Sequence, residues 1–562
     1  MEPSSAPEAL SDPPSSPPAS ESPRDPQSKR DGATPRIRLA RSAGLVGVAT
    51  MTSRALGVVR EQVLAYAFGA SDVMDAFNVA FRLPNLMRDL FAEGAMSAAF
   101  VPTFTRHLAQ RGKNEAWRLG ARVMSALIVV TALLVVLAMV FADQLVWLYA
   151  SEYAAVPGKL ELTTELTRVM FPFLTLVAVA VAMMGMLNAI GYFFVPSLSP
   201  ALFNVATILS VFLIVPLMPR FGWHPTMGLA IGVLLGGLAQ VAVQWPLLER
   251  QGFRFRFELA PRDPGLREVL LLLGPGTLGV AAMQINLFVS TYLATSQGTG
   301  AVASLAYAFR LMYLPIGLFG VSIATAVVPA LSQHAARDDI AALRRTFSHA
   351  VRLTMMLNVP ASVGLMTLAT PIVALLYERG AFTSSATTTV ALALMAYAPG
   401  LIGYSTVKVA SPTFYALRDS RTPATVSVVA VAANVVFSIT LVRMMGFVGL
   451  ALGTALASLV NGGVLFWLLR RRLHGIDGRR IAVAFVKILA ASLVMGGAAW
   501  LVQQQFELWL PGRALVRQLV RVLGSIGVAL AVLLACSKLL RIKEFDEAFG
   551  SVTRRVLARL RP

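Results

Sequence analysis

Apolar stretches of about 20 residues recur through this 562-residue sequence from Arg41 to Leu540, and they restrict the possible folds more than any other feature. A helix of that length crosses a hydrocarbon layer of about 30 Å. Inside lipid each segment must satisfy its own backbone hydrogen bonds, which leaves helices or closed barrels. The stretches do not alternate between polar and apolar residues, so they predict helices. The composition agrees, because 56% of the residues are hydrophobic and only 14% are charged, against about 25% charged in soluble domains.

The stretches predict fourteen membrane spans with both chain ends in the cytoplasm. The spans start near residues 42, 73, 119, 163, 197, 226, 267, 301, 346, 386, 422, 447, 481 and 516. If the N-terminus is inside, the loops after even-numbered spans are cytoplasmic, and these loops hold the arginine groups at 106–118, 250–267, 337–345, 418–421 and 470–480. The opposite loops offer only Lys159, Arg220, Arg379, Arg443 and Arg513. Because Lys and Arg accumulate in cytoplasmic loops, this asymmetry supports an even number of spans.

The first 40 residues are rich in Pro and Ser and predict a disordered cytoplasmic tail. No short apolar segment with a cleavage site precedes Arg41, so we expect no cleaved signal peptide. The net charge of +20 follows from the basic cytoplasmic loops, and we therefore expect no nucleic-acid partner. The single cysteine, Cys536, excludes an internal disulfide and a thiolate metal cluster.

Two long segments of the sequence resemble each other at an offset of 227 or 228 residues. The sequence Ala-Phe-Arg-Leu at 80–83 returns at 308–311, and prolines recur in three pairs, Pro102 with Pro329, Pro172 with Pro399, and Pro196 with Pro423. Each unit contains six spans, an even number, so the units face the same way. We therefore expect a tail (1–40), an N-lobe (41–250), a parallel C-lobe (266–472), two added helices (481–540) and a cytoplasmic C-terminal tail (541–562). Transporters built from such repeats hold their substrate between the lobes.

Charged residues within the predicted spans are candidate site residues, because a charge in lipid is unfavourable by several kcal/mol. Arg54 lies 13 residues beyond Arg41, about 20 Å along a helix, too far to reach the inner surface. Arg60 and Glu61 follow, and snorkelling to the outer interface is the alternative for both. The second span contains Asp75, Arg82, Arg88, Asp89 and Glu93 around Pro84 and Asn85, and the proline should kink or break that helix. Arg310, the repeat mate of Arg82, and Lys408 add cations in the C-lobe.

Two interpretations of these charges stay open. They pair with one another as interhelical contacts, or they line a water-filled cavity in the N-lobe, which their number favours. No catalytic triad, phosphate loop or pair of catalytic carboxylates stands out, and the five histidines lack metal-ligand spacing. We therefore expect neither an enzyme nor a metal site. Tyr377, Glu378 and Arg379 in an outer loop predict a solvated turn.

Several motifs resemble the MurJ/MviN family of lipid flippases. They are SRALGVVRE at 53–61, FGA at 68–70, DAF at 75–77, RLPNLMR at 82–88, RLM at 310–312 and VKVASP at 407–412. The run FAEGAMSAAFVP at 91–102 is the most diagnostic of them. The resemblance covers residues 41 to 540, and fourteen spans is the number that this family has.

The resemblance implies an all-α polytopic fold with two parallel six-helix lobes, shared with multidrug and oligosaccharide exporters of the MATE type, and two extra helices that form a lipid-facing groove. The implied substrate is lipid II, an undecaprenyl diphosphate that carries a disaccharide pentapeptide. Arg54, Arg60, Arg88 and Arg310 match the family's essential cavity arginines, and Asp75 and Glu93 match its acids. The residue before the span-eight arginine is Phe309, where the family often has an acid, and spans seven and eleven lack the acids of a sodium site.

The sequence therefore predicts a flippase that moves lipid II to the periplasmic leaflet of a bacterial inner membrane by alternating access, for cell-wall synthesis. We expect a monomer that needs no cofactor beyond the membrane potential, with a coupling cation left open, and that contacts membrane lipids and cell-wall synthesis proteins. The predicted substrate-binding residues are Arg54, Arg60, Asp75, Arg82, Asn85, Arg88, Glu93, Arg310 and Lys408. The alternatives are a cation-coupled exporter of drugs or oligosaccharide-lipids, and a membrane scaffold without transport activity.

Overall fold

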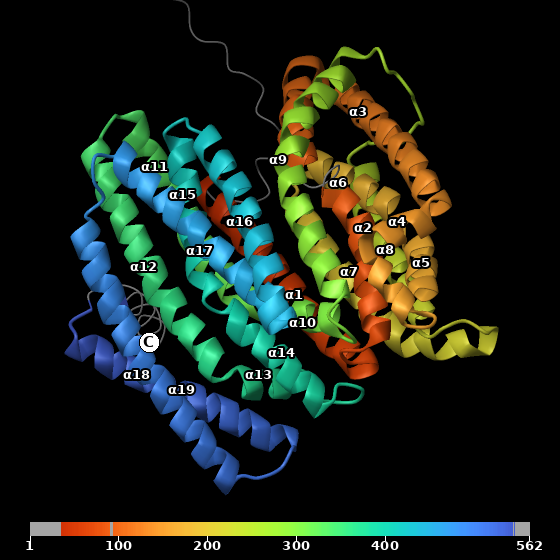
Figure 1. The fold of residues 1–562 in the computed structure, drawn as a ribbon. Coiled ribbons are helices and arrows are strands. Elements are labelled where there is room, and N and C mark those ends of the chain that lie inside the picture. Colours follow the sequence, from red (N-terminus) through yellow and green to blue (C-terminus); the bar gives the residue numbers. More distant parts are fainter. Residues whose placement is uncertain (1–34, 90–93, 543, 546–562) are drawn as a thin grey trace, which may run out of the picture.

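The computed structural model describes residues 35–89, 94–542 and 544–545, and every regular element in this part of the chain is a helix. The helices form two bundles that lie side by side, as Figure 1 shows. We keep the names N-lobe for α1 to α8 and C-lobe for α9 to α17. Two further helices, α18 and α19, lie on the side of the C-lobe that faces away from the N-lobe. Residues 1–34 of the predicted disordered tail (1–40) lie outside the described residues, and for residues 35–40 the prediction was wrong, because they form the start of α1.

The N-lobe contains eight α-helices and two short 3₁₀ segments. Their bounds are α1 (Pro35–Phe68), α2 (Asp72–Arg88), α3 (Gly94–Val140), α4 (Ala142–Ala150), η3 (Ser151–Ala155), α5 (Lys159–Met170), α6 (Phe173–Ala189), α7 (Phe194–Leu213), η4 (Val215–Phe221) and α8 (Thr226–Arg250). Helix α1 packs on α7, α7 on α8, α3 on α6, and α2 on α5. Element α3 consists of two helices that meet at a kink, where Gly112 has a non-helical conformation with a φ of 82°.

The C-lobe repeats this plan. Its elements are α9 (Pro264–Thr295), α10 (Ala301–Pro315), the π-helix η5 (Ile316–Gly320), α11 (Val321–Ala336), α12 (Ile340–Thr367), α13 (Ala369–Tyr377), α14 (Ser384–Tyr397), α15 (Gly400–Ala416), α16 (Arg421–Met445) and α17 (Phe447–Arg472). Helix α9 contacts α3 of the N-lobe as well as α16 of its own lobe, so it links the two bundles. The added helices are α18 (Gly478–Trp509), which packs on α12, and α19 (Leu515–Leu539), which packs on α18 and α13.

The repeated residues occupy equivalent places in the two lobes. Pro172 is the N-cap of α6 after the break that follows α5, and Pro399 is the N-cap of α15 after the break that follows α14. The sequence Gly-Leu-Ala at 228–230 also returns at 449–451 after a small deletion. Gly228 in α8 lies against the backbone of Val215, and Gly449 in α17 lies against the backbone of Leu441. A side chain at either glycine would overlap that backbone. The two lobes therefore share the positions of a helix break and of a close helix contact.

The predicted count of fourteen spans stays a prediction. Among the described residues, eight helices are long and apolar enough to cross a membrane, or up to ten if each strongly bent helix pair is one span. Three of the other predicted spans correspond to α1, α2 and the α10–α11 pair. Helices α1 and α2 carry the intramembrane charges, and the α10–α11 pair is interrupted by η5. Mean hydropathy does not identify a span whose helix carries several charged residues or is interrupted.

Pro84 does not break its helix, contrary to one of the two expected outcomes. Helix α2 continues through the buried Pro84 and ends at Arg88. In the C-lobe, the π-helix η5 follows Pro315 directly. Single π-helical turns inside α-helices are rare and often accompany functional sites. The second helix of the C-lobe repeat is thus interrupted at η5.

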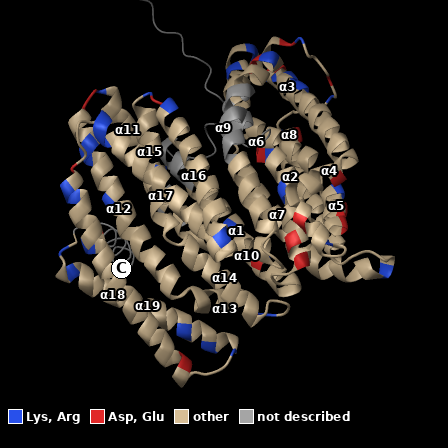
Figure 2. Cartoon of the chain, in the orientation of Figure 1, with Lys and Arg blue, Asp and Glu red and all other residues tan. Residues whose placement is uncertain are grey.

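The basic residues mark one end of the bundles. Figure 2 shows many of the Lys and Arg residues at the end where α3 turns and α11 ends. We call this the inner end, following the predicted orientation. The opposite, outer end carries the connections 69–71, 296–300 and 378–383. In Figure 1 the lobes lie closest at the outer end, near α10, and diverge toward the inner end.

Neighbouring glycines in α18 test how the added helices dock. A Cβ at Gly496 would lie 2.6 Å from Val363 Cγ1 of α12, whereas nothing lies within 4 Å of a Cβ at Gly497. We expect Gly496→Leu to destabilise the purified protein by about 1–3 kcal/mol, because it overpacks the contact with α12. The matched Gly497→Leu should stay within about 0.5 kcal/mol. Thermal unfolding in detergent measures both, and equal effects would contradict the docking.

Candidate transport site between the lobes

A cavity of about 380 Å³ lies between the lobes, bounded by α2 on one side and by α9, α10, α14, α15 and α17 on the other. Its polar lining consists of Asn78, Arg82, Asn85, Asn286, Ser290, Thr291, Arg310, Tyr397, Tyr404 and Thr454. Arg82 has no acidic partner among the described residues, and the buried Oδ1 atom of Asn85 accepts no hydrogen bond from them. The cavity therefore presents a cation without an acidic counterion and an amide oxygen without a donor in the described part of the chain.

Arg310 pairs across the lobe boundary with Glu61 of α1. Glu61 also accepts hydrogen bonds from Arg60, at 2.7 Å from Nη2 and 3.2 Å from Nε. Glu61 is only 4% exposed, so snorkelling to the interface does not describe it. Glu61 was a candidate by its position in a span but is absent from the predicted substrate-binding residues, and Phe309 stands before Arg310 where the family often has an acid. The structure supplies a carboxylate beside Arg310 from the opposite lobe.

Two more predicted arginines take part in contacts that bridge helices. Arg54 Nη1 donates to the carbonyl oxygen of Gly317 in η5 at 2.9 Å, which joins α1 to the C-lobe at the π-helical break. Arg88 pairs with Asp89 at 2.8 Å, and Gln284 of α9 donates to the other oxygen of Asp89 at 3.1 Å. The intramembrane charges therefore pair with one another and also flank a cavity, which lies between the lobes and not within the N-lobe as expected.

Asp75 lies outside the cavity, at the outer end, and is fully buried. Its carboxylate accepts hydrogen bonds from the backbone N–H groups of Gly300 and Ala303, both at 2.8 Å, at the start of α10 in the C-lobe. Lys159 of α5 donates to Asp75 at 3.0 Å and to Asp72 at 2.5 Å. Helix α10 has no side-chain cap of its own, so Asp75 caps it from the other lobe and holds the outer end closed.

The outer end is also closed by direct contact of the two backbones. Ala381 N donates to the carbonyl oxygen of Tyr66 at 2.8 Å. Gly69, Gly300 and Gly380 all have positive φ angles, and a Cβ on any of them would overlap a carbonyl oxygen of the opposite lobe. Glycine is required at these places for both reasons.

The predicted solvated turn after α13 is part of this closed end. Tyr377 is only 3% exposed, and its ring packs against those of Tyr307 and Phe382 at centroid distances of 5.0 and 5.7 Å. The interpretation of Tyr377 as solvent-exposed was wrong, because the turn faces α10 rather than water. Glu378 pairs with Arg513 in the connection between α18 and α19 at 3.4 Å, so the turn contacts the added helices as well.

Five of the eight predicted site residues in the described part of the chain do not line the cavity, namely Arg54, Arg60, Asp75, Arg88 and Lys408. Lys408 on α15 is exposed, does not line the cavity and has no ion-pair partner among the described residues. Glu93 lies outside the described residues. Asp75 belongs to the outer closure, as described above. Arg82, Asn85 and Arg310 line the cavity directly.

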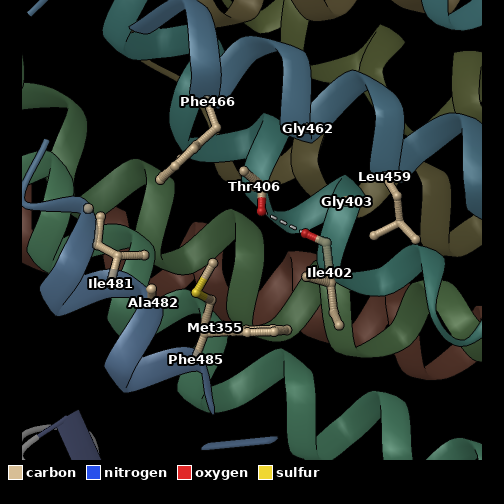
Figure 3. Close-up of a pocket in the computed structure, with 12 residues that line it drawn as sticks. Met355, Ile402, Gly403, Thr406, Leu459, Gly462, Phe466, Ile481, Ala482 and Phe485 are labelled. Atoms are coloured by element: carbon tan, nitrogen blue, oxygen red, sulfur yellow. Dashed lines mark hydrogen bonds between the residues drawn. The ribbon is translucent and has the colours of Figure 1, made fainter. Parts of the chain in front are cut away.

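An apolar groove of about 330 Å³ runs between the C-lobe and the first turns of α18. Figure 3 shows Ile402, Leu459, Phe466, Ile481 and Phe485 around it, with Thr406 Oγ1 donating to the carbonyl oxygen of Ile402 at 2.8 Å. The hydroxyl is thereby satisfied within its own helix, and the groove presents mainly hydrocarbon. Its surface suits an acyl or prenyl chain.

Helices α9 and α16 are the predicted spans seven and eleven, which lack the acids of a sodium site. Amide and hydroxyl side chains meet between them instead. Asn434 Nδ2 donates to Asn286 Oδ1 at 2.6 Å and to Ser290 Oγ at 3.1 Å. In the part of the chain that the structure describes, no group of three or more His, Cys, Asp or Glu residues is arranged to hold a metal ion.

The chain is similar to known proteins over most of its length. A family described as lipid II flippase MurJ matches residues 64–520. A probable lipid II flippase MurJ from Vibrio cholerae is 34% identical over 521 residues, covering 91% of this chain and 97% of the relative. One from Haemophilus influenzae is 33% identical, covering 82% and 92%.

Solved structures agree with these relatives. A lipid II flippase MurJ in an inward closed conformation matches with a TM-score of 0.72 at 26% identity, over 88% of this chain and 98% of that one. An inward-facing multidrug transporter of the MATE family matches with a TM-score of 0.63 at 17% identity, over 77% and 98%. The second likeness shows a shared fold alone, which confirms the predicted two-lobe, MATE-like class.

The Glu61 cluster can be tested by stability measurements. Glu61→Gln should destabilise the purified protein by about 2–3 kcal/mol, less than the ~3–5 kcal/mol typical of a fully buried pair, because the Arg310 side chain is 36% exposed. The control Glu115→Gln removes a surface partner of Arg118 and should change stability by less than about 1 kcal/mol. Thermal unfolding in detergent measures both. A Glu61→Gln variant as stable as the control would contradict the inter-lobe pair.

Proposed function

Because the chain belongs to the lipid II flippase MurJ family, we propose that it moves lipid II from the cytoplasmic to the periplasmic leaflet by alternating access between its two lobes. The protein is a multi-pass membrane protein of the inner membrane. In this proposal its termini face the cytoplasm, so the end rich in arginine is the side from which the substrate loads.

One observation carries the proposal. Arginines from both lobes, Arg82 on α2 and Arg310 on α10, line a single cavity whose outer side is closed by Asp75 and by backbone contacts. A diphosphate is recognised well by guanidinium groups, whose planar fork matches phosphate oxygens and stays charged. Substrate that enters from the inner end meets these groups before any outer exit exists, as alternating access requires.

The cavity size indicates which stage of the cycle the structure represents. Pockets of about 300–1,000 Å³ hold drug-sized ligands, and a disaccharide pentapeptide is larger than these. A cavity of about 380 Å³ therefore admits the diphosphate region alone. In the proposed cycle the lobes separate further at the inner end, the headgroup loads, the inner end closes, and the outer contacts break.

The lipid tail stays in hydrocarbon throughout this cycle. The headgroup cannot cross lipid unaided, since unpaired polar groups are unfavourable there by several kcal/mol each. The prenyl chain lies beside α18 and α19, where the C-lobe offers an apolar groove. The two added helices thus guide the tail while the lobes shelter the headgroup.

Membrane potential is sufficient to bias the cycle outward in this proposal. Moving two negative charges across an inside-negative potential of 100 mV releases roughly 4.6 kcal/mol, at about 2.3 kcal/mol per charge. A coupling cation would add to this. The protein acts as a monomer, beside cell-wall synthesis proteins that consume the substrate.

A cation-coupled exporter of drugs or oligosaccharide-lipids is the second candidate. It shares the fold, with identities to MATE structures of 15–18%. The family match over residues 64–520 and the two added helices favour the flippase instead.

We expect Arg310→Ala and Arg54→Ala to abolish flipping while the protein still inserts and accumulates. Each removes a guanidinium group that bridges the lobes, and Arg310 also faces the cavity. The matched control is Arg443→Ala, an exposed arginine at the end of α16 that should retain activity. Lipid II in each leaflet is measured after depletion of the native copy. Normal flipping by Arg310→Ala would remove that residue from the site, and drug efflux without lipid II movement would favour the second candidate.

A further inference from the structure

Lys159 is a buried lysine at the start of α5, in a segment that the sequence presents as an ordinary outer loop. Its side chain is only 3% exposed. Its Nζ atom donates to Asp72 Oδ1 at 2.5 Å and to Asp75 Oδ2 at 3.0 Å, and it lies 4.0 Å from the ring centroid of Tyr153. A lysine so buried needs charged partners to stay in place. Two carboxylates and an aromatic face supply them.

The partners of Lys159 all come from its own lobe, on α2 and η3. The two carboxylates also bind the opposite lobe. Asp75 accepts from the N–H groups of Gly300 and Ala303, and Asp72 Oδ2 accepts from the Thr299 hydroxyl at 3.0 Å. Each acid therefore has one contact that persists when the lobes separate, to Lys159, and others that must break.

This arrangement has an electrostatic consequence for the closed outer end. Without a cation, two neighbouring carboxylates would repel each other, and Asp75 would be a charge buried without a counterion. Water solvates both acids once the outer end opens, so removal of the cation destabilises the closed state more than the open one. The charge of Lys159 therefore allows Asp75 to stay ionised while it caps α10 of the C-lobe.

We propose that Lys159 is a positioning residue for the transport cycle, the counterion that keeps Asp72 and Asp75 charged and aligned so that they latch the N-terminus of α10 and hold the outer end closed. This inference rests on the proposed function for its role in transport. The latch itself is a property of the protein alone and can be measured without substrate.

A competing explanation is that Lys159 merely packs α5 against α2. Packing depends on the shape and length of the side chain, whereas the latch depends on its charge. Arginine at this position keeps the charge, and glutamine keeps much of the length without the charge. The two substitutions therefore separate the explanations.

The experiment measures the distance between the lobes at the outer end. In a Cys536→Ser background, Arg220→Cys in η4 and Ser385→Cys in α14 place spin labels on exposed outer positions of the N-lobe and the C-lobe. The full-length protein is reconstituted in vesicles without lipid II, and pulsed electron spin resonance gives the fraction of open molecules. We expect Lys159→Gln to raise the ratio of open to closed molecules about tenfold or more.

The controls decide between outcomes. Lys159→Arg should keep the wild-type distribution, and adding Asp72→Asn to Lys159→Gln should restore part of the closed population, because it removes the repulsion between the acids. An unchanged distribution in folded Lys159→Gln, or an equal opening in Lys159→Arg, would overturn the proposal. If Lys159→Gln does not fold, the double variant Lys159→Gln/Asp75→Asn removes the uncompensated charge, but its amide has a single acceptor oxygen for the two N–H groups of Gly300 and Ala303. It should therefore still open, and a closed distribution would overturn the latch. None of these outcomes depends on the flipping assay, so a failure of the proposed function is seen separately.

Discussion

A charge inside a membrane protein has to find a partner, and in this chain the partners lie across the boundary between two lobes. Glu61 of the N-lobe meets Arg310 of the C-lobe, and Asp75 meets the first turn of α10. An apolar interface of the same extent would hold the lobes together without an alternative arrangement. Polar contacts can be exchanged for water or for a charged ligand when the lobes move. The requirement for charge neutralisation therefore produces an interface that is specific and reversible.

The two repeat units differ in how their arginines are neutralised at this interface. Helices α2 and α10 are repeat mates, and each carries an arginine toward the same cavity, Arg82 and Arg310. Yet Arg310 is matched by an acid and Arg82 has none among the described residues. A symmetric fold thus surrounds an asymmetric distribution of charge. That asymmetry gives an anion a preferred side of the cavity, which a symmetric ring of charges would not.

The sequence predicted the architecture and part of the site. Apolar length and the repeat register are local or periodic signals, and they predicted the helical, two-lobe fold. Charge within an apolar span is a local signal as well, and it singled out Arg82 and Arg310, which line the cavity. The partners were not predictable in the same way. Lys159 lies 84 residues from Asp75, and Glu61 lies 249 residues from Arg310, so their pairing depends on how whole helices dock. Burial of Tyr377 was missed for the same reason, because its cover comes from α10.

The glycines at the outer end have a consequence for leakage. At Gly69, Gly300 and Gly380 the two lobes touch through main chain, with no room for even one methyl group. Such a contact leaves no gap for a file of water molecules, along which protons and small ions could cross the membrane. A protein that passes a bulky polar headgroup needs a wide passage at one moment and a watertight one at the next. Contact between glycine backbones seals the closed state, and these glycines place no side chain in the passage when it opens.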